Sequence, residues 1–167
     1  MNIHHILLAL ALCTAITACA QQTEKQQPTP TQQGIAKPES TVTIVQGKVN
    51  KISQADFAQL VADYTADEWR FLAKRPAIVD FNATWCGPCR RLAPILEELA
   101  AQYSGEIDFY AIDVDENPDI AQAFEVRSIP MILFCPTQGE PQAVTGLYPK
   151  EELIKVINYI IFSKTQQ

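Results

Sequence analysis

The chain has 167 residues, of which 47% are hydrophobic and 19% are charged, and its net charge is −6. This length and composition suit one folded domain with additional segments. No cluster of basic residues is present, so we expect no nucleic-acid partner. The five cysteines are too few, and odd in number, for a fold held together by disulfides.

The N-terminal segment is predicted to be an export signal. Residues 6–18 form an almost wholly apolar run that ends in small residues, as secretory signal peptides do. The run is shorter than the roughly 18–20 residues that span a bilayer. Residues 16–19, with the sequence Ile-Thr-Ala-Cys, resemble a bacterial lipobox, so we expect a lipoprotein-type signal at residues 1–18 and a lipid on Cys19. Residues 18–20 also fit ordinary signal cleavage, which is the alternative.

A polar segment separates this signal from the predicted domain at residues 41–167. Residues 21–40 contain six glutamines and three prolines, a composition that cannot bury a core, so residues 19–40 are predicted to be a flexible tether. We therefore expect the domain on the periplasmic side of a bacterial membrane, either lipid-anchored or soluble. The two histidines, His4 and His5, would be lost with the signal, which excludes Cys–His catalysis and histidine-ligated zinc.

The first part of the domain is predicted to contain strands followed by helices. Residues 41–52 are rich in Val, Ile and Thr, which predicts one or two strands around Gly47. Ser53 is the expected N-cap of a helix, whose apolar face carries Phe57, Leu60, Val61 and Tyr64. A second, short helical piece is predicted over residues 67–72.

Hydrophobic periodicity also predicts the remaining elements. They are a strand at 77–81, a helix at 88–103, a strand at 107–113, a helix at 118–124 capped by Asn117, strands at 131–134 and 143–145, and a final helix with Leu153, Val156, Ile157 and Ile160 on one face. Strands joined through helices imply parallel pairing, and the last two strands, joined across Gly139, imply an antiparallel hairpin. The expected fold class is α/β, with a central mixed β-sheet flanked by helices on both faces.

Two cysteines stand where a strand gives way to a helix. Pro88 is a natural first residue of a helix, which places Cys86 at the helix N-terminus. Free backbone N–H groups and the helix dipole favour an anion there, so the pKa of the Cys86 thiol should be lowered. Cys89 lies one turn later, on the same face as buried leucines. We therefore expect Cys86 to be the exposed nucleophile and Cys89 the sheltered thiol that resolves a mixed disulfide.

Asp80 is the one charged residue in the apolar strand at residues 77–81. Burial should raise the pKa of its carboxyl, which makes it a candidate acid or base for Cys89; a structural Asp is the alternative. Half of a zinc site is the alternative for the cysteine pair, but zinc needs four ligands and only Cys19 and Cys135 remain. We expect neither a metal nor a cofactor. Cys135 is expected to be a half-buried packing residue, with a regulatory thiol as the alternative.

Residues 79–90, which include the Trp-Cys-Gly-Pro-Cys motif, resemble the thioredoxin family. The similarity continues through residues 93–98, 112–118 and 126–131, and covers about residues 49–162. It implies the thioredoxin fold and a redox disulfide between Cys86 and Cys89.

The resemblance also implies roles for the surrounding residues. Pro130 would be a cis-proline that faces the disulfide, and Ile129 would offer backbone hydrogen bonds to a substrate. The substrate surface would include Trp85, Gly87, Pro88 and Gly146. Thioredoxins usually place a lysine near the buried acid, where this chain has Ala111, so we expect a higher pKa for Asp80.

The expected function is an exported reductase that opens disulfides of extracytoplasmic proteins. A monomer is expected, with electrons supplied by a membrane-embedded thiol relay. A net oxidase or isomerase of secreted proteins is one alternative, and a non-enzymatic binding lipoprotein is another. The Gly-Pro pair between the cysteines favours reduction, because it is the thioredoxin pair, with a potential of about −270 mV.

Overall fold

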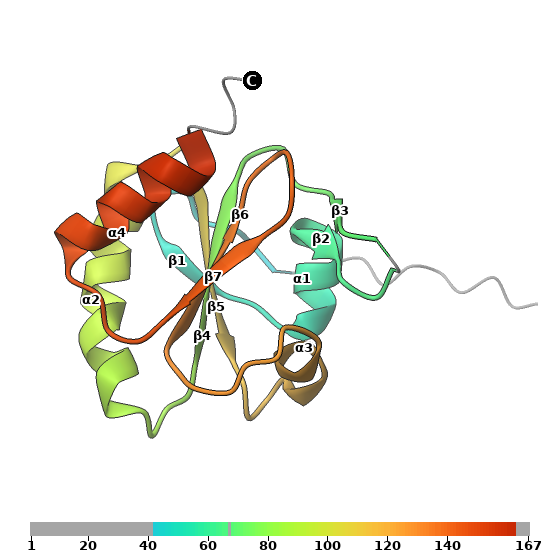
Figure 1. The fold of residues 1–167 in the computed structure, drawn as a ribbon, viewed down its shortest axis with the longest axis horizontal. Coiled ribbons are helices and arrows are strands. Elements are labelled where there is room, and N and C mark those ends of the chain that lie inside the picture. Colours follow the sequence, from blue (N-terminus) through green and yellow to red (C-terminus); the bar gives the residue numbers. More distant parts are fainter. Residues whose placement is uncertain (1–41, 67, 163–167) are drawn as a thin grey trace, which may run out of the picture. The chain divides into compact units, whose positions relative to one another are not determined.

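The computed structural model describes residues 42–66 and 68–162, so the predicted signal and tether lie outside the described residues. Figure 1 shows the elements in chain order: β1 (Val49–Lys51), α1 (Gln54–Leu60), β2 (Ala62–Asp63), β3 (Arg70–Phe71), β4 (Ala77–Asn82), α2 (Gly87–Gln102), β5 (Asp108–Asp113), α3 (Pro118–Ala123), β6 (Met131–Cys135), β7 (Gln142–Thr145), α4 (Lys150–Ile157) and a π-helical turn, η1 (Asn158–Phe162).

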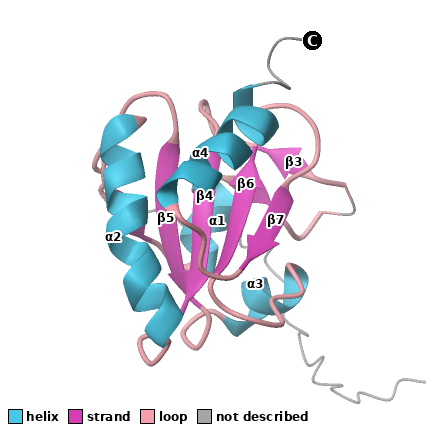
Figure 2. Ribbon diagram, turned by 60° about the vertical axis from the view of Figure 1, so that its left-hand side comes forward, coloured by secondary structure: helices cyan, strands magenta, loops and turns pink. Residues whose placement is uncertain are grey.

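A five-stranded sheet in the order β1-β5-β4-β6-β7 forms the centre of the domain. Strands β1, β5 and β4 are parallel, and β6 and β7 run antiparallel to their neighbours. Helices α2 and α4 cover one face of the sheet, and α1 and α3 cover the other (Figures 1 and 2). The predicted mixed sheet with helices on both faces is confirmed.

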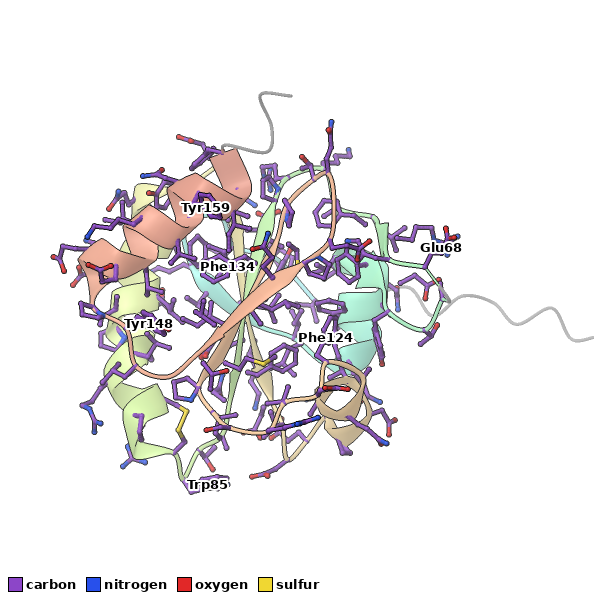
Figure 3. All side chains as sticks on the ribbon, in the orientation of Figure 1. Glu68, Trp85, Phe124, Phe134, Tyr148 and Tyr159 are labelled. Carbon is purple, nitrogen blue, oxygen red and sulfur yellow. A yellow bond between two sulfur atoms is a disulfide. The ribbon has the colours of Figure 1, made fainter. Side chains whose placement is uncertain are left out.

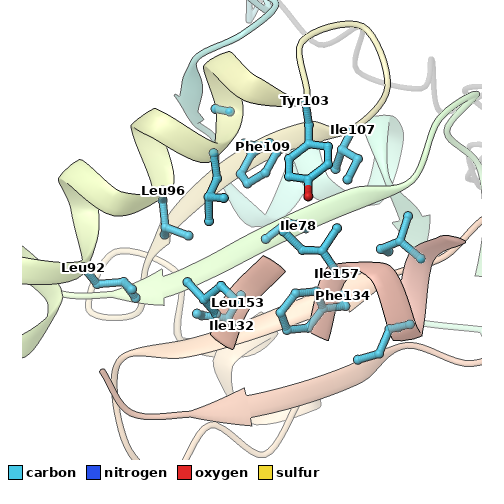
Figure 4. Packing of buried hydrophobic residues seen from close by; sticks show 14 residues of the cluster. Ile78, Leu92, Leu96, Tyr103, Ile107, Phe109, Ile132, Phe134, Leu153 and Ile157 are labelled. Atoms are coloured by element: carbon cyan, nitrogen blue, oxygen red, sulfur yellow. The ribbon is translucent and has the colours of Figure 1, made fainter. Parts of the chain in front are cut away.

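Each face of the sheet has its own hydrophobic core. Under α2 and α4 the core includes Ile78, Leu92, Leu96, Phe109, Ile132, Phe134, Leu153 and Ile157 (Figure 4). On the other face the core includes Phe57, Val79, Phe81, Ile112 and Ile120. Side chains alternate between the two faces along β4, so Asp80 shares its face with Ile78 and lies under α2. This alternation fixes the position of the candidate acid.

The first strand is shorter than predicted. Within residues 42–52 only Val49–Lys51 is a strand. The Asn50 side chain holds the preceding segment: its Oδ1 accepts from Val45 N at 2.8 Å and its Nδ2 donates to Val45 O at 3.1 Å. These bonds satisfy the backbone groups of Val45 that a strand partner would otherwise bind.

The predicted helical piece at residues 67–72 is wrong. Strand β3 pairs there with β2, in the antiparallel register Ala62↔Phe71 and Asp63↔Arg70. Trp69 and Phe71 are half-buried and alternate with exposed residues, which is the two-residue period of a strand. Both aromatic side chains pack against the core next to α1, and this packing outweighs local helix preference.

The helix caps are partly as predicted. Ser53 caps α1 in a reciprocal capping box with Asp56, as expected. Asn117 is the N-cap of α3 by position, but its side chain makes no capping bond to that helix. Its Oδ1 accepts from Gln54 N at 2.7 Å, and its Nδ2 donates to Asp113 O at 2.9 Å. Asn117 therefore ties the start of α1 to the end of β5.

Candidate active site

The two cysteines of the motif form a disulfide at the start of α2. Cys86 is the N-cap of this helix, and its Cα lies 5.3 Å from the Cα of Cys89. The backbone N–H of Cys89 donates to Cys86 Sγ at 3.2 Å. This is one of the N–H groups that a helix N-terminus leaves free. In the reduced protein the same group, with the helix dipole, would favour a thiolate at Cys86.

The predicted contrast in exposure is wrong for this oxidised form. Cys86 is 3% exposed and Cys89 is 4% exposed, so both sulfurs are sheltered. Ala83, Val114 and Ile129 pack around the pair. What distinguishes the two sulfurs here is the backbone hydrogen bond at Cys86.

Asp80 is buried on β4, and only 4% of it is exposed. Burial raises the pKa of its carboxyl to about 6, partly offset by a hydrogen bond from Asn82. Asn82 Nδ2 donates to Asp80 Oδ2 at 3.0 Å, whereas no described residue donates to the buried Oδ1. Ala111 is opposite Asp80 in β5, at the position where the resemblance led us to expect a lysine.

A cavity of about 320 Å³ joins Asp80 to the disulfide region. Its lining includes Lys51, Asp80, Cys89, Glu97 and Ala111. Asp80 and Cys89 therefore line the same cavity.

The Ile129–Pro130 peptide bond is cis. Pro130 is buried, and its carbonyl accepts a hydrogen bond from Gly146 N at 2.8 Å. Ile129 is half-buried against the disulfide cluster, so the cis peptide lies next to the sulfurs. Gly146 has φ +114, which favours glycine, and an added Cβ would meet nothing within 4 Å. The positive φ of residue 146, rather than a lack of space for a side chain, explains why glycine is found at this position.

Trp85 is 67% exposed and projects from the edge of the domain (Figure 3). Its indole Nε1 donates to Asp115 Oδ2 at 2.7 Å, which fixes the ring. A groove of about 380 Å³ runs beside it, lined by Trp85, Val114, Val126, Arg127, Ser128 and Ile129. Gly87 and Pro88 lie in the adjacent first turn of α2, and Pro88 is exposed.

Sequence reasoning missed several residues that the structure brings to this site. Asn82 was not predicted to touch Asp80, although its position two residues later on a strand places both side chains on one face. Val114, Asp115 and the residues preceding Ile129 had been noted only as parts of family-like segments. For Val126, Arg127 and Ser128 the available signal was their position directly before Ile129 and Pro130.

Cys135 lies on β6 and is completely buried, more than the half-buried position predicted. Burial raises the pKa of its thiol, which disfavours the reactive thiolate. Within residues 42–66 and 68–162, no three His, Cys, Asp or Glu side chains gather to hold a metal ion. Over the same described ranges, no helix is both long and apolar enough to span a membrane.

Comparison with known proteins agrees with the site. The thioredoxin family model matches residues 48–159. A thioredoxin from Borreliella burgdorferi is 44% identical over 107 residues, which cover 64% of this chain and 92% of that protein. A chloroplastic M-type thioredoxin from Pisum sativum is 44% identical over 103 residues, covering 61% of this chain and 60% of that protein.

Solved structures show the same likeness. A chloroplastic thioredoxin z superposes with a TM-score of 0.55 at 32% identity, covering 71% of this chain and 96% of that one. A mutant thioredoxin from Halobacterium salinarum gives a TM-score of 0.54 at 30% identity, covering 70% and 94%. With its Cys86–Cys89 pair, the chain therefore belongs to the thioredoxin family and is a thiol–disulfide oxidoreductase.

Proposed function

We propose that this protein is an exported reductase that opens disulfides in extracytoplasmic proteins through Cys86 and Cys89. The observation that carries the proposal is the backbone N–H of Cys89, 3.2 Å from Cys86 Sγ at the start of α2. This arrangement would stabilise a thiolate on Cys86 and supports its proposed role as the nucleophile. Cys89 is then the resolving thiol.

The reaction takes place in two exchanges. The reduced Cys86 thiolate attacks a substrate disulfide, forms a mixed disulfide and releases one substrate thiolate. Cys89 then loses its proton and attacks Cys86 Sγ, which frees the second substrate thiolate and leaves the Cys86–Cys89 disulfide. The substrate gains two electrons and the dithiol loses two.

Asp80 is the proposed acid/base partner of Cys89. Both side chains line the same cavity, and burial raises the Asp80 pKa to about 6. An acid/base group works best when its pKa is close to the pH at which the protein operates. Asp80 would accept the Cys89 proton during resolution and return a proton when the disulfide is reduced again.

The substrate would bind in the groove beside Trp85. The Ile129 backbone precedes the cis-Pro130 peptide, so it is available to pair with an extended substrate segment next to the sulfurs. Gly87 and Pro88 present a small surface at the helix start, and Gly146 braces Pro130 through its N–H. We propose that these residues form the substrate surface.

The compartment is proposed from the sequence of residues 1–40. The signal peptide would end before a lipidated Cys19, and residues 19–40 would tether the domain to the periplasmic face of a membrane. We propose that the domain acts there as a monomer. A membrane-embedded thiol relay would supply electrons, because the compartment is oxidising. Intact mass of the membrane-extracted protein tests the lipid: the mass of a soluble form, cleaved without acylation, contradicts it.

A trapping experiment tests the reductase. Cys89→Ala prevents resolution, so substrates should accumulate as mixed disulfides on Cys86 and be released by dithiothreitol. Cys86→Ala is the matched control and should trap far less. Equal trapping by both variants would refute the assignment of nucleophile and resolving thiol.

The reduction potential separates the reductase from an oxidase or isomerase. We expect a value near −270 mV and reduction of insulin disulfides in the presence of dithiothreitol. A potential above about −200 mV favours the oxidase alternative. A Cys86→Ser strain without any phenotype would favour the non-enzymatic binding role.

A further inference from the structure

One carboxylate oxygen of Asp80 has no hydrogen-bond donor among the described residues. Asp80 is 4% exposed, and its Oδ1 is buried with no partner among the described residues. Such an oxygen is costly to leave unpaired when the carboxyl is ionised. Asp80 lines a cavity of about 320 Å³, which gives a cationic side chain room to approach the carboxyl.

A row of three residues crosses the sheet from Lys51 to Asp80. Lys51 on β1 is opposite Ala111 on β5, which in turn is opposite Asp80 on β4. Directly opposed residues point to the same face of a sheet. Two strand spacings separate the backbones of Lys51 and Asp80 by about 10 Å. The methyl group of Ala111 leaves this space open, and an extended lysine side chain can cross most of it.

Lys51 pairs with Glu116 at the surface, and Asp113 on β5 is a second acidic group that raises the pKa of Lys51. Its Nζ lies 2.8 Å from Glu116 Oε2, and these side chains are 62% and 60% exposed. Exposed ion pairs of this kind contribute little to stability, so Lys51 can leave Glu116 at small cost.

The other charged groups around the cavity come from α2. The Arg90 Nη1 donates to Thr84 O at 3.1 Å, and Glu97 Oε2 accepts from Val49 N at 3.4 Å. The remaining titratable group is the Cys89 thiol, which is in the disulfide here. Among these lining residues, Lys51 is the cation positioned in line with Asp80 across the sheet.

We propose that Lys51 is a mobile counter-ion of Asp80, which crosses Ala111 to the unpaired Oδ1 when Asp80 is ionised and pairs with Glu116 when Asp80 is protonated. Lys51 is a positioning residue, since it contacts neither sulfur. By favouring ionised Asp80, it sets the pH range of proton exchange with Cys89, a step that rests on the proposed function.

Carboxyl ¹³C NMR of the oxidised full chain tests this, because the disulfide removes both cysteines from the titration and the Asp80→Asn spectrum assigns the signal. Lys51→Met should raise the Asp80 midpoint by about 0.5–1 pH unit, and Lys51→Arg should restore it. Lys48→Met, which removes an exposed charge outside the cavity lining, is the control and should shift it by less than about 0.2 unit.

Glu116→Gln releases Lys51 and should lower the midpoint. In the Lys51→Met background, Glu116→Gln should change the Asp80 midpoint little. This double-mutant cycle isolates the coupling between Glu116 and Asp80 that passes through Lys51. Equal shifts from Lys51→Met and Lys48→Met, or an unchanged midpoint in Glu116→Gln, would overturn the proposal. Glu116→Gln does not change β1. If Lys51→Met does not fold, the Asp80 midpoint in Glu116→Gln therefore tests the proposal by itself. No substrate is used, so these results are independent of the reductase assays.

Discussion

Replacing Asp80 by asparagine should remove a pH-dependent loss of stability. The carboxyl is buried on β4, and burial raises its pKa from 3.8 to about 6. Below about pH 3 it is protonated in both the native and the unfolded state. Between about pH 4 and 6 the unfolded chain loses this proton while the native protein keeps it. The native state then binds more protons, so stability falls as the pH rises through this window.

The size of the effect follows from the two pKa values. Their difference is about 2, and at 1.36 kcal/mol per pKa unit it corresponds to a loss of about 3 kcal/mol that is complete above the native pKa of about 6. The asparagine amide brings hydrogen-bonding needs of its own, which shift stability equally at every pH. We therefore compare the free energy of unfolding of the wild type with that of Asp80→Asn at each pH. The relevant quantity is how this difference changes with pH.

Urea unfolding of the oxidised chain, followed by tryptophan fluorescence from pH 4 to 8, measures this quantity. Relative to Asp80→Asn, the wild type should lose about 2.4 kcal/mol between pH 4 and 7.5, since the first part of the loss occurs below pH 4. Glu106→Gln, which removes an exposed carboxylate, is the matched control. A difference between wild type and Asp80→Asn that stays constant across this range would refute the reasoning.

Two substitutions and one labelling experiment probe other parts of the domain. Asn117→Ala should lower the free energy of unfolding by about 2 kcal/mol, because it removes the buried bonds to Gln54 and Asp113; urea unfolding would show no such loss if those bonds are unimportant. Glu125→Gly should raise that free energy by up to about 1 kcal/mol, since Glu125 has φ 49; a loss would contradict this. Buried Cys135 should resist DTNB until the chain unfolds, as peptide mapping would show; labelling of the native protein would contradict this.

The site was only partly predictable from sequence. The Trp-Cys-Gly-Pro-Cys spacing and the strand-to-helix transition placed Cys86 at a helix N-terminus, and the structure places it there. An isolated charge in an apolar strand marked Asp80 as buried with a raised pKa, and both features are present. The two-residue period of a strand places Asn82 on the same face as Asp80, and the two side chains are hydrogen-bonded. The predicted exposure of Cys86 was wrong, because Val114 and Ile129, which are distant in the sequence, pack against the disulfide cluster.

Local periodicity and capping chemistry predicted most elements and the position of the cysteine pair, because these depend on neighbouring residues, and the connections between strands implied a mixed sheet. Tertiary structure decided what depends on distant residues. Strand β3 replaced a predicted helix because Trp69 and Phe71 pack on the core. Asn117 holds α1 instead of capping α3 because α1 brings an unpaired N–H to it. Only sheet register aligned Lys51, Ala111 and Asp80, since strand pairing joins segments that are far apart in the sequence.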